Sequence, residues 1–422
     1  MKAIFKKTAA FAASAMLAAA LAVPTMTASA ATPPDLGAAT PTTLEKTITV
    51  YNDDNATVYV PSITYTYSVE PAAGGKTVTD KNGNQSVVKA GIDGGIVMGT
   101  DATAVFPTTG NETVAASAAG VPVTDTFEIK FDASVFSSAG IYRYLLTEDV
   151  AAADLKNAGI SRPAEYKNTR YIDVYVKKNA DGVMEIAGSV VFFADDDLTK
   201  STEKTNGFTD KTGTNETEEF SQDTDPVVSV ADKYFTYNYV VKKVVENSYT
   251  NDEKFDFTID VAGTTGQKFF YSPVDGTVAT ATTEGTVGTP VTASLGNNNS
   301  IILAGLPANV TVAVKESNGN PATYDVTVAD TGTATLALNN SSIKNGEETG
   351  FTAQNISAYT GTESEKPDAN LIQTTFTNKL VDISPTGLVF MIAPFVIMLA
   401  AGAFLFGMVT KNRKKDDAES II

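Results

Sequence analysis

The sequence predicts an all-β protein built from two tandem β-sandwich domains, with one additional helix at each end of the chain. Apolar and polar residues alternate with a period of two in many short runs, which is typical of half-buried strands. Helical periodicity is nearly absent between the ends, and clusters of Gly, Asn, Asp and Thr separate the runs at sandwich-like intervals. The region between the two end helices has about 350 residues, which is too long for one hydrophobic core.

The alternation can be followed from strand to strand. In the first half the runs are Leu44–Val50, Ile63–Val69, Phe127–Phe131, Ile141–Leu146, Tyr171–Val176 and Met184–Phe193. In the second half they are Tyr237–Val245, Phe255–Val261, Ser300–Leu303, Val310–Val314, Thr333–Leu338 and Leu371–Phe376. Val150–Ala158 has the spacing of a helical turn or two, and Gly263–Asn299, rich in Gly and Thr, is expected to form hairpins and loops.

These runs predict two domains with a linker between them. The linker is polar and acidic and has no apolar period until Val227. The predicted segments are a signal peptide (1–30), a flexible leader (31–43), a first sandwich (44–210), the linker (211–231), a second sandwich (232–380) and a C-terminal signal (381–422).

The N-terminal segment has the three parts of a secretory signal peptide. Lys2, Lys6 and Lys7 make a basic start, and an apolar run follows. Small residues then precede the predicted cleavage site between Ala30 and Ala31. The body of the protein is therefore expected outside the cytoplasm.

The C-terminal segment predicts a membrane span. Leu388–Val409 carries no charge and, at about 1.5 Å per residue, is long enough to cross a hydrocarbon core of roughly 30 Å. The basic cluster Lys411–Lys415 would remain on the cytoplasmic side.

The order of Pro385, Thr386 and Gly387, the apolar span and the basic tail resembles the cell-wall sorting signal of Gram-positive surface proteins. The resemblance implies that sortase cleaves between Thr386 and Gly387 and joins the Thr carboxyl to an amine on peptidoglycan or on another pilin subunit. The usual signal has one residue between proline and threonine, whereas here they are adjacent. The alternative is a plain anchor helix with a chance Pro-Thr-Gly.

The composition excludes several classes of function. With 31 Lys and Arg against 49 Asp and Glu, the chain is acidic and would repel nucleic acid and anionic membranes. It has no His and no Cys, which excludes Ser-His and Cys-His nucleophile pairs, a conventional zinc site and disulfides. We therefore expect no cofactor and no metal, and the chain is not expected to be an enzyme.

The two halves share an ordered set of ionisable residues. Each half has a lysine in an early strand, a glutamate at the end of a later strand, and a carboxyl or carboxamide after a Phe-Thr pair. These residues are Lys46, Glu148 and Asp210 in the first half, and Lys242, Glu316 and Asn378 in the second. Strand parity predicts that all of them point to the same side of their strands as nearby apolar residues. The spacing from Glu148 to Asp210 is 62 residues, the same as from Glu316 to Asn378. Such groups would be very costly to bury unpaired.

An intramolecular isopeptide bond would explain this arrangement. Burial favours a neutral, nucleophilic lysine amine and a protonated glutamate, which can polarise the acceptor carbonyl and transfer the proton. Ammonia would leave from Asn378 and water from Asp210. Asn206 and Asn238 are alternative acceptors in the first half. Two other readings remain open: an ordinary buried ion pair, or a lysine that extends to solvent.

The stretch Phe136–Glu148 makes the first half similar to the streptococcal pilin isopeptide-linkage (FctA-type) domain. Val240–Val244, Leu306–Glu316 and Thr375–Asn378 make the second half similar to a related pilin or CnaB-like domain. The resemblance implies Ig-like or CnaB-like sandwiches, a bond from Lys46 assisted by Glu148, and a bond between Lys242 and Asn378 assisted by Glu316. The first half departs from the family pattern in having Asp210 where Asn is usual.

The leading functional prediction is a structural surface protein, specifically a pilus subunit, in the cell wall of a Gram-positive bacterium. Its expected partners are sortase, peptidoglycan, other pilin subunits and a host or bacterial ligand. A Tyr-Pro-Lys-like polymerisation motif is absent, and Lys177 and Lys178 only faintly resemble one. The alternatives are a monomeric wall-anchored adhesin with binding loops at 87–124 or 263–299, and a secreted enzyme.

Overall fold

A computed structural model describes residues 42–79, 85–164, 166–193, 204–209, 211–212, 228–229, 231–247, 252–316, 324–330, 342–343, 349–353 and 372–380. The predicted signal peptide, its cleavage site at Ala30 and Ala31, the span 388–409, and Pro385, Thr386 and Gly387 lie outside these residues. Asp210 also lies outside them. In the described part of the chain, no helix has both the length and the apolar character needed to cross a membrane.

The predicted all-β class is confirmed. The strands of the first half are β1 (Thr42–Asn52), β2 (Thr57–Tyr59), β3 (Ile63–Pro71), β4 (Thr77–Thr79), β5 (Gln85–Ala90), β6 (Ile96–Met98), β7 (Thr103–Phe106), β8 (Thr113–Ala115), β9 (Val121–Phe131), β10 (Gly140–Asp149), β11 (Ile160–Ser161), β12 (Thr169–Lys178), β13 (Met184–Phe193), β14 (Lys204–Thr205), β15 (Gly207–Phe208), β16 (Lys211–Thr212) and β17 (Val228–Ser229). The predicted helical turn near residue 150 is confirmed as α2 (Ala152–Ala158), which ends at Gly159 in the left-handed conformation.

The second half continues the same pattern. Its strands are β18 (Asp232–Glu246), β19 (Lys254–Ala262), β20 (Lys268–Tyr271), β21 (Thr283–Thr286), β22 (Val291–Gly296), β23 (Ser300–Pro307), β24 (Thr311–Glu316), β25 (Tyr324–Asp330), β26 (Ser342–Ile343), β27 (Thr349–Ala353) and β28 (Ile372–Leu380). Short 3-10 turns lie at Ala133–Val135 and Val278–Thr280.

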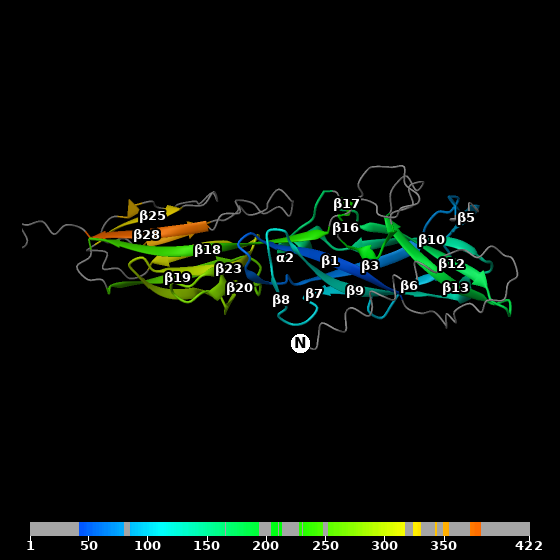
Figure 1. Cartoon of the computed structure of the whole chain (residues 1–422), viewed down its shortest axis with the longest axis horizontal. Coiled ribbons are helices and arrows are strands. Elements are labelled where there is room, and N and C mark those ends of the chain that lie inside the picture. Colours follow the sequence, from blue (N-terminus) through cyan, green and yellow to red (C-terminus); the bar gives the residue numbers. More distant parts are fainter. Residues whose placement is uncertain are drawn as a thin grey trace, which may run out of the picture.

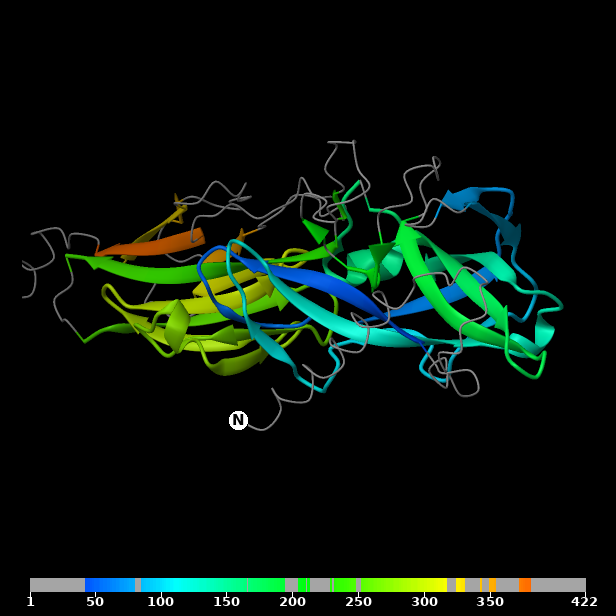
Figure 2. The ribbon, with the colours of Figure 1, turned by 45° about the vertical axis from the view of Figure 1, so that its right-hand side comes forward.

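Each half packs one sheet over another around its own apolar core. In the first half, β6, β9 and β1 face a sheet in the order β14-β13-β12-β10-β3-β7. In the second half, β21, β20, β23, β18 and β28 face the sheet β22-β19-β24-β27. The two lobes lie end to end, so the molecule is elongated (Figures 1 and 2).

Strand β18 belongs to both lobes. Its first residues, Asp232–Thr236, pair in parallel with Ile48–Asn52 of β1. Its later residues, Tyr239–Glu246, pair in parallel with Ile372–Lys379 of β28. The predicted second domain starts at residue 232, but the structure places the first five residues of that segment in the sheet of the first lobe. Figure 1 shows β18 running along the axis that joins the lobes.

Polar contacts join the lobes around helix α2. The Thr264 hydroxyl donates to the Asn157 carbonyl at 2.7 Å, and Asn309 Nδ2 donates to the carbonyls of Lys156 and Asn157 at 3.2 and 3.0 Å. The second lobe therefore supplies donors to the last carbonyls of a helix in the first, groups that a helix leaves without intrahelical partners.

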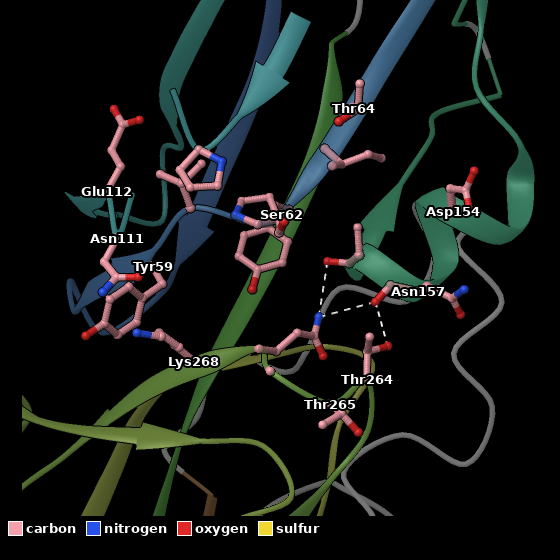
Figure 3. Close-up of a pocket in the computed structure, with 18 of the residues that line it drawn as sticks. Tyr59, Ser62, Thr64, Asn111, Glu112, Asp154, Asn157, Thr264, Thr265 and Lys268 are labelled. Carbon is pink, nitrogen blue, oxygen red and sulfur yellow. Dashed lines mark hydrogen bonds between the residues drawn. The ribbon is translucent and has the colours of Figure 1, made fainter. Parts of the chain in front are cut away.

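A hollow of about 700 Å³ lies beside these contacts. Figure 3 shows Asp154 and Asn157 on one side, Tyr59 and Asn111 on the other, and Thr264 pointing toward Asn157. The Tyr59 ring stacks on Phe270 of the second lobe with centroids 4.4 Å apart. The hollow thus follows the junction of the lobes.

Candidate functional site: two buried lysine clusters

The first cluster centres on Lys46, whose side chain is fully buried in the first core. Its Nζ lies 3.0 Å from Glu148 Oε2 and 2.8 Å from Asp232 Oδ2. Lys46 is in β1, Glu148 is near the end of β10 in the facing sheet, and Asp232 is the first residue of β18. Three segments far apart in sequence therefore place an amine between two carboxyl groups.

Tyrosines enclose the Lys46 amine. It donates to the Tyr166 hydroxyl at 2.8 Å and lies 4.2 Å from the centroid of the Tyr65 ring. The Tyr65 hydroxyl donates to Asp232 at 3.0 Å, and the Tyr166 hydroxyl donates to Glu148 at 2.8 Å. Burial raises the pKa of both tyrosines well above the ordinary value, so both hydroxyls remain protonated donors.

Arg162 completes the first cluster. Its Nε donates to Asp232 Oδ1 and its Nη2 to Asp232 Oδ2, each at 2.8 Å. The same Nη2 donates to Glu148 Oε1 at 2.5 Å. This fork is the bidentate geometry in which guanidinium binds carboxylate most strongly. Within the described residues of this cluster, the two cations Lys46 and Arg162 thus contact two carboxyl groups.

The second cluster joins Lys243, Glu316 and Asn378. Lys243 Nζ lies 3.2 Å from Glu316 Oε2 and 4.2 Å from the centroid of the Phe255 ring. Asn378 Nδ2 donates to Glu316 Oε1 at 2.5 Å. All three polar residues are buried, and within the described part of the chain Asn378 Oδ1 receives no hydrogen bond. Glu316 thus holds the Lys243 amine at one carboxyl oxygen and the Asn378 amide nitrogen at the other.

The prediction of Lys242 as the second lysine is wrong in position. Lys242 is only partly buried, whereas Lys243 is fully buried and contacts Glu316. Strand parity predicted that Lys242 shares a face with the core, but the core of this lobe takes the odd-numbered residues Tyr239, Val241 and Val245. Valines occupy both parities here, so the sequence alternation was ambiguous.

A carboxyl group that the sequence did not indicate also contacts Lys46. The predicted acceptor Asp210 lies outside the described residues, and besides Glu148 the carboxyl group that contacts Lys46 is that of Asp232. Of the alternative acceptors, Asn206 is exposed and donates to Glu45. Asn238 is buried but binds Asn52 and the Gly305 amide instead.

Strand register shows that the two clusters have equivalent geometry. Ile48, two residues after Lys46, pairs with Asp232; Val245, two residues after Lys243, pairs with Asn378. Both pairings are parallel.

The facing sheets match in the same way. Tyr67 pairs with Glu148, and Phe257 pairs with Glu316. Two positions before each of these aromatics, Tyr65 and Phe255 lie beside the lysine amine, each at 4.2 Å. The chain therefore builds one arrangement twice.

Electrostatics differ between the clusters. In the second, burial lowers the pKa of Lys243 from 10.5 to about 8, against the opposing effect of the Glu316 charge. About one Lys243 amine in ten is then neutral at pH 7. In the first, burial raises the pKa of Asp232, but the charges and hydrogen bonds of Lys46 and Arg162 outweigh this and lower it to about 2.

Sequence reasoning missed three charged members of the clusters, Asp232, Lys243 and Arg162. The alternation of Tyr237, Tyr239 and Val241 is a signal that could have indicated Lys243. No periodic signal marks Asp232 or Arg162, because their positions depend on pairing between distant strands.

Comparisons with known proteins add only distant matches. A family model described as a domain of unknown function (DUF7601) matches residues 239–356. A comparison with curated proteins finds no match. Among solved structures, the chain is similar to the major pilin from Streptococcus pyogenes, with 16% identity, a TM-score of 0.43, and coverage of 82% of this chain and 99% of that chain.

Two further S. pyogenes major pilins give similar values. For T3.2 the identity is 20%, the TM-score 0.43 and the coverage 81% of this chain and 99% of that one. For T-13 the identity is 21%, the TM-score 0.42 and the coverage 81% of this chain and 97% of that one. At this distance the matches carry no functional conclusion, and the function proposed below rests on the two clusters.

Proposed function

We propose that this protein is a structural subunit of a Gram-positive surface fibre, a pilus subunit, whose two lobes cross-link themselves by intramolecular isopeptide bonds. One bond joins Lys46 to Asp232, with Glu148 assisting. The other joins Lys243 to Asn378, with Glu316 assisting. The repeated register of the two clusters is the observation that supports this proposal.

In the second lobe, the neutral Lys243 amine attacks Cγ of Asn378. For this attack the amide first rotates so that protonated Glu316 donates to Oδ1. Glu316 then carries the amine proton to Nδ2 and recovers its own proton from Oδ1 as the intermediate collapses. The Cγ–Nδ2 bond breaks, ammonia leaves, and a secondary amide remains. Burial supplies the neutral amine that this attack needs.

In the first lobe, Lys46 attacks Cγ of Asp232 in its protonated form. Glu148 transfers a proton from the amine to the departing hydroxyl, so water leaves and an amide forms. Each reaction takes place once in each molecule and consumes its own residues. The chemistry is therefore self-processing, and the protein is not an enzyme that turns over a substrate.

The placement of the bonds suits a fibre under tension. Lys46 lies in the first strand of the first lobe, and Asn378 lies in the last described strand of the second. Asp232 and Lys243 lie on the same strand, β18. A covalent path thus runs from β1 through β18 to β28, and most of each sandwich lies outside it.

Attachment to the cell wall is part of the proposal. The Pro385-Thr386-Gly387 motif and the apolar span after it support sortase cleavage after Thr386. In the sortase reaction, the amine that receives the Thr386 carboxyl would be on peptidoglycan or on another subunit. A ladder of high-molecular-weight species on denaturing gels of wall extracts would support a polymer, and a single band would indicate a monomeric stalk or adhesin.

Intact-mass spectrometry tests the bonds. Loss of ammonia and of water should lower the mass of the wild-type chain by about 17 and about 18 Da. Asn378→Ala should retain only the loss of water, and Lys46→Met only the loss of ammonia. A wild-type mass equal to the sequence mass would overturn the proposal.

A further inference from the structure

Arg162 has no role in the reaction proposed above, yet it makes two hydrogen bonds to the acceptor of the first bond. Its guanidinium donates to both oxygens of Asp232 and to Glu148. The arginine side chain is 23% exposed, whereas the carboxyl side chains that it contacts are fully buried. It therefore covers the acceptor carboxyl on its solvent side.

The charges of the first cluster balance. Lys46 and Arg162 carry two positive charges, and Glu148 and Asp232 carry two negative charges. The neutral hydroxyls of Tyr65 and Tyr166 supply the remaining donors. Moving a proton away from one member of a fully paired buried cluster costs free energy, because it leaves another charge unpaired.

The acceptor of the second cluster differs in charge. Asn378 has a neutral amide, so the charge of Lys243 faces that of Glu316 alone within this triad. An aspartate acceptor adds a negative charge, and Arg162 supplies the positive charge that offsets it.

We propose that Arg162 is the counter-ion that adapts the first cluster to an aspartate acceptor, and that by holding Asp232 as a carboxylate it makes the Lys46–Asp232 cross-link the slower of the two to form. This inference rests on the function proposed above. It identifies a residue that sets the order in which the two lobes are linked.

The chemistry follows from the protonation states. Attack on Asp232 needs a neutral amine and a protonated acid, so a proton must move from Lys46 to the carboxyl before the bond forms. Arg162 binds the ionised carboxylate through two charge-assisted hydrogen bonds and so stabilises the unreactive state. The low pKa of Asp232 agrees with this arrangement.

Arg162 also accounts for the charges in the product. Bond formation removes the positive charge of Lys46 and the negative charge of Asp232 together, and water leaves. The ion pair between Arg162 and Glu148 remains, so the buried glutamate keeps a partner. The cluster is therefore neutral before and after the reaction.

A pulse-chase experiment on the full chain in a Gram-positive host tests the inference. Cells receive a short pulse of isotopically labelled lysine, and samples are quenched at intervals and digested. The peptide pair joined through Lys46 and Asp232 is then quantified against the pair joined through Lys243 and Asn378. In the wild type, the second pair should appear first.

Arg162→Gln leaves one lysine facing two carboxyl groups, so one carboxyl must take up a proton. We expect the first cross-link to form about tenfold faster, which corresponds to about 1.4 kcal/mol in the barrier. Arg162→Lys, which keeps the charge, should restore the slow rate. Lys177→Gln removes a positive charge paired with Glu185 elsewhere in the same lobe and serves as the matched control.

Asp232→Asn gives a second test should Arg162→Gln fail to fold. The acceptor then needs no counter-ion, and the excess positive charge favours a neutral Lys46 amine. The first cross-link should form faster than in the wild type, with loss of ammonia in place of water. Two results would overturn the inference. One is a wild-type chain in which the first cross-link forms as fast as the second. The other is a folded Arg162→Gln or Asp232→Asn chain in which the first cross-link forms no faster than in the wild type.

The cross-links found in the wild type distinguish a failure of the proposed function from a failure of the inference about Arg162. If neither pair is linked in the wild type, the proposed function itself fails. If both pairs form in the wild type and only the effect of Arg162 is missing, the proposed function stands and this inference fails.

Discussion

One position in the sequence separates a buried lysine from a solvated one. Lys243 lies beside Glu316 in the core, and its neighbour Lys242 is partly exposed on the opposite face of β18. Successive side chains of a strand point to opposite faces, so adjacent lysines have unrelated surroundings. The pair offers a matched comparison within one strand.

Lys243→Met should abolish the loss of about 17 Da and lower the free energy of unfolding. The proposed bond would seal the segment between residues 243 and 378, which is longer than a hundred residues, so its loss should cost on the order of 4–5 kcal/mol. Denaturant unfolding followed by circular dichroism measures the change. Lys242→Met is the control, and an equal effect of both substitutions would contradict this assignment.

When Lys243 is buried but not cross-linked, the free energy of unfolding should depend on pH through the titration of its amine. In Asn378→Ala the amine has no acceptor, and its pKa of about 8 lies below the unfolded value of 10.5. Between these values the unfolded state binds a proton that the folded state has released, so stability rises with pH. We expect a gain on the order of 2 kcal/mol from pH 7.5 to 9.5, measured by urea unfolding.

The double variant Lys243→Met with Asn378→Ala isolates the contribution of this amine, since it lacks the titrating group. Over the same pH range, its free energy of unfolding should change only by the contribution of the other titratable groups. Equal slopes in the single and double variants would show that Lys243 does not titrate in this window.

At the scale of elements, β18 decides which side chains reach each core. Asp232 is buried at the first cluster and Tyr234 in the first core, whereas Tyr239 and Val241 face the second core. The pairing of β18 with β23 shifts register between Tyr237 and Tyr239. One strand can therefore present the even-numbered Asp232 to one lobe and the odd-numbered Lys243 to the other.

Helix α2 joins the lobes through its last carbonyls. Asn309→Ala removes two of the hydrogen bonds that reach them from the second lobe, a loss of about 1 kcal/mol for each bond. We expect a wider distribution of angles between the lobes, measured by small-angle scattering, with little change in the melting of either core. Asn111→Ala is the control, since Asn111 is exposed on the other side of the hollow (Figure 3). Unchanged scattering would show that these bonds do not hold the junction.

At the scale of the whole molecule, the lobes lie in series along one axis (Figure 2). Force applied before β1 and after β28 would pass along the covalent path from Lys46 to Asn378. The segments 46–232 and 243–378 would be shielded from extension when both bonds are present.

Single-molecule pulling tests this arrangement. The wild-type chain should show no unfolding step from either shielded segment. Lys243→Met should add one step of roughly 45 nm, from 135 residues at about 3.5 Å each. Lys242→Met should behave as the wild type does, and long steps in the wild type would contradict the load path.

The sequence by itself determined the all-β class, the helical turn that became α2, and four residues that lie in the clusters: Lys46, Glu148, Glu316 and Asn378. These features depend on the alternation of side chains within a single strand or turn, which is a local property.

Only the tertiary structure decided that Asp232 lies against Lys46, that Lys243 and not Lys242 contacts Glu316, and that Arg162 pairs with Asp232. These positions depend on which strands pair and in which register. Parallel pairing joins segments separated by more than a hundred residues, and the sequence carries no periodic mark of such a partner.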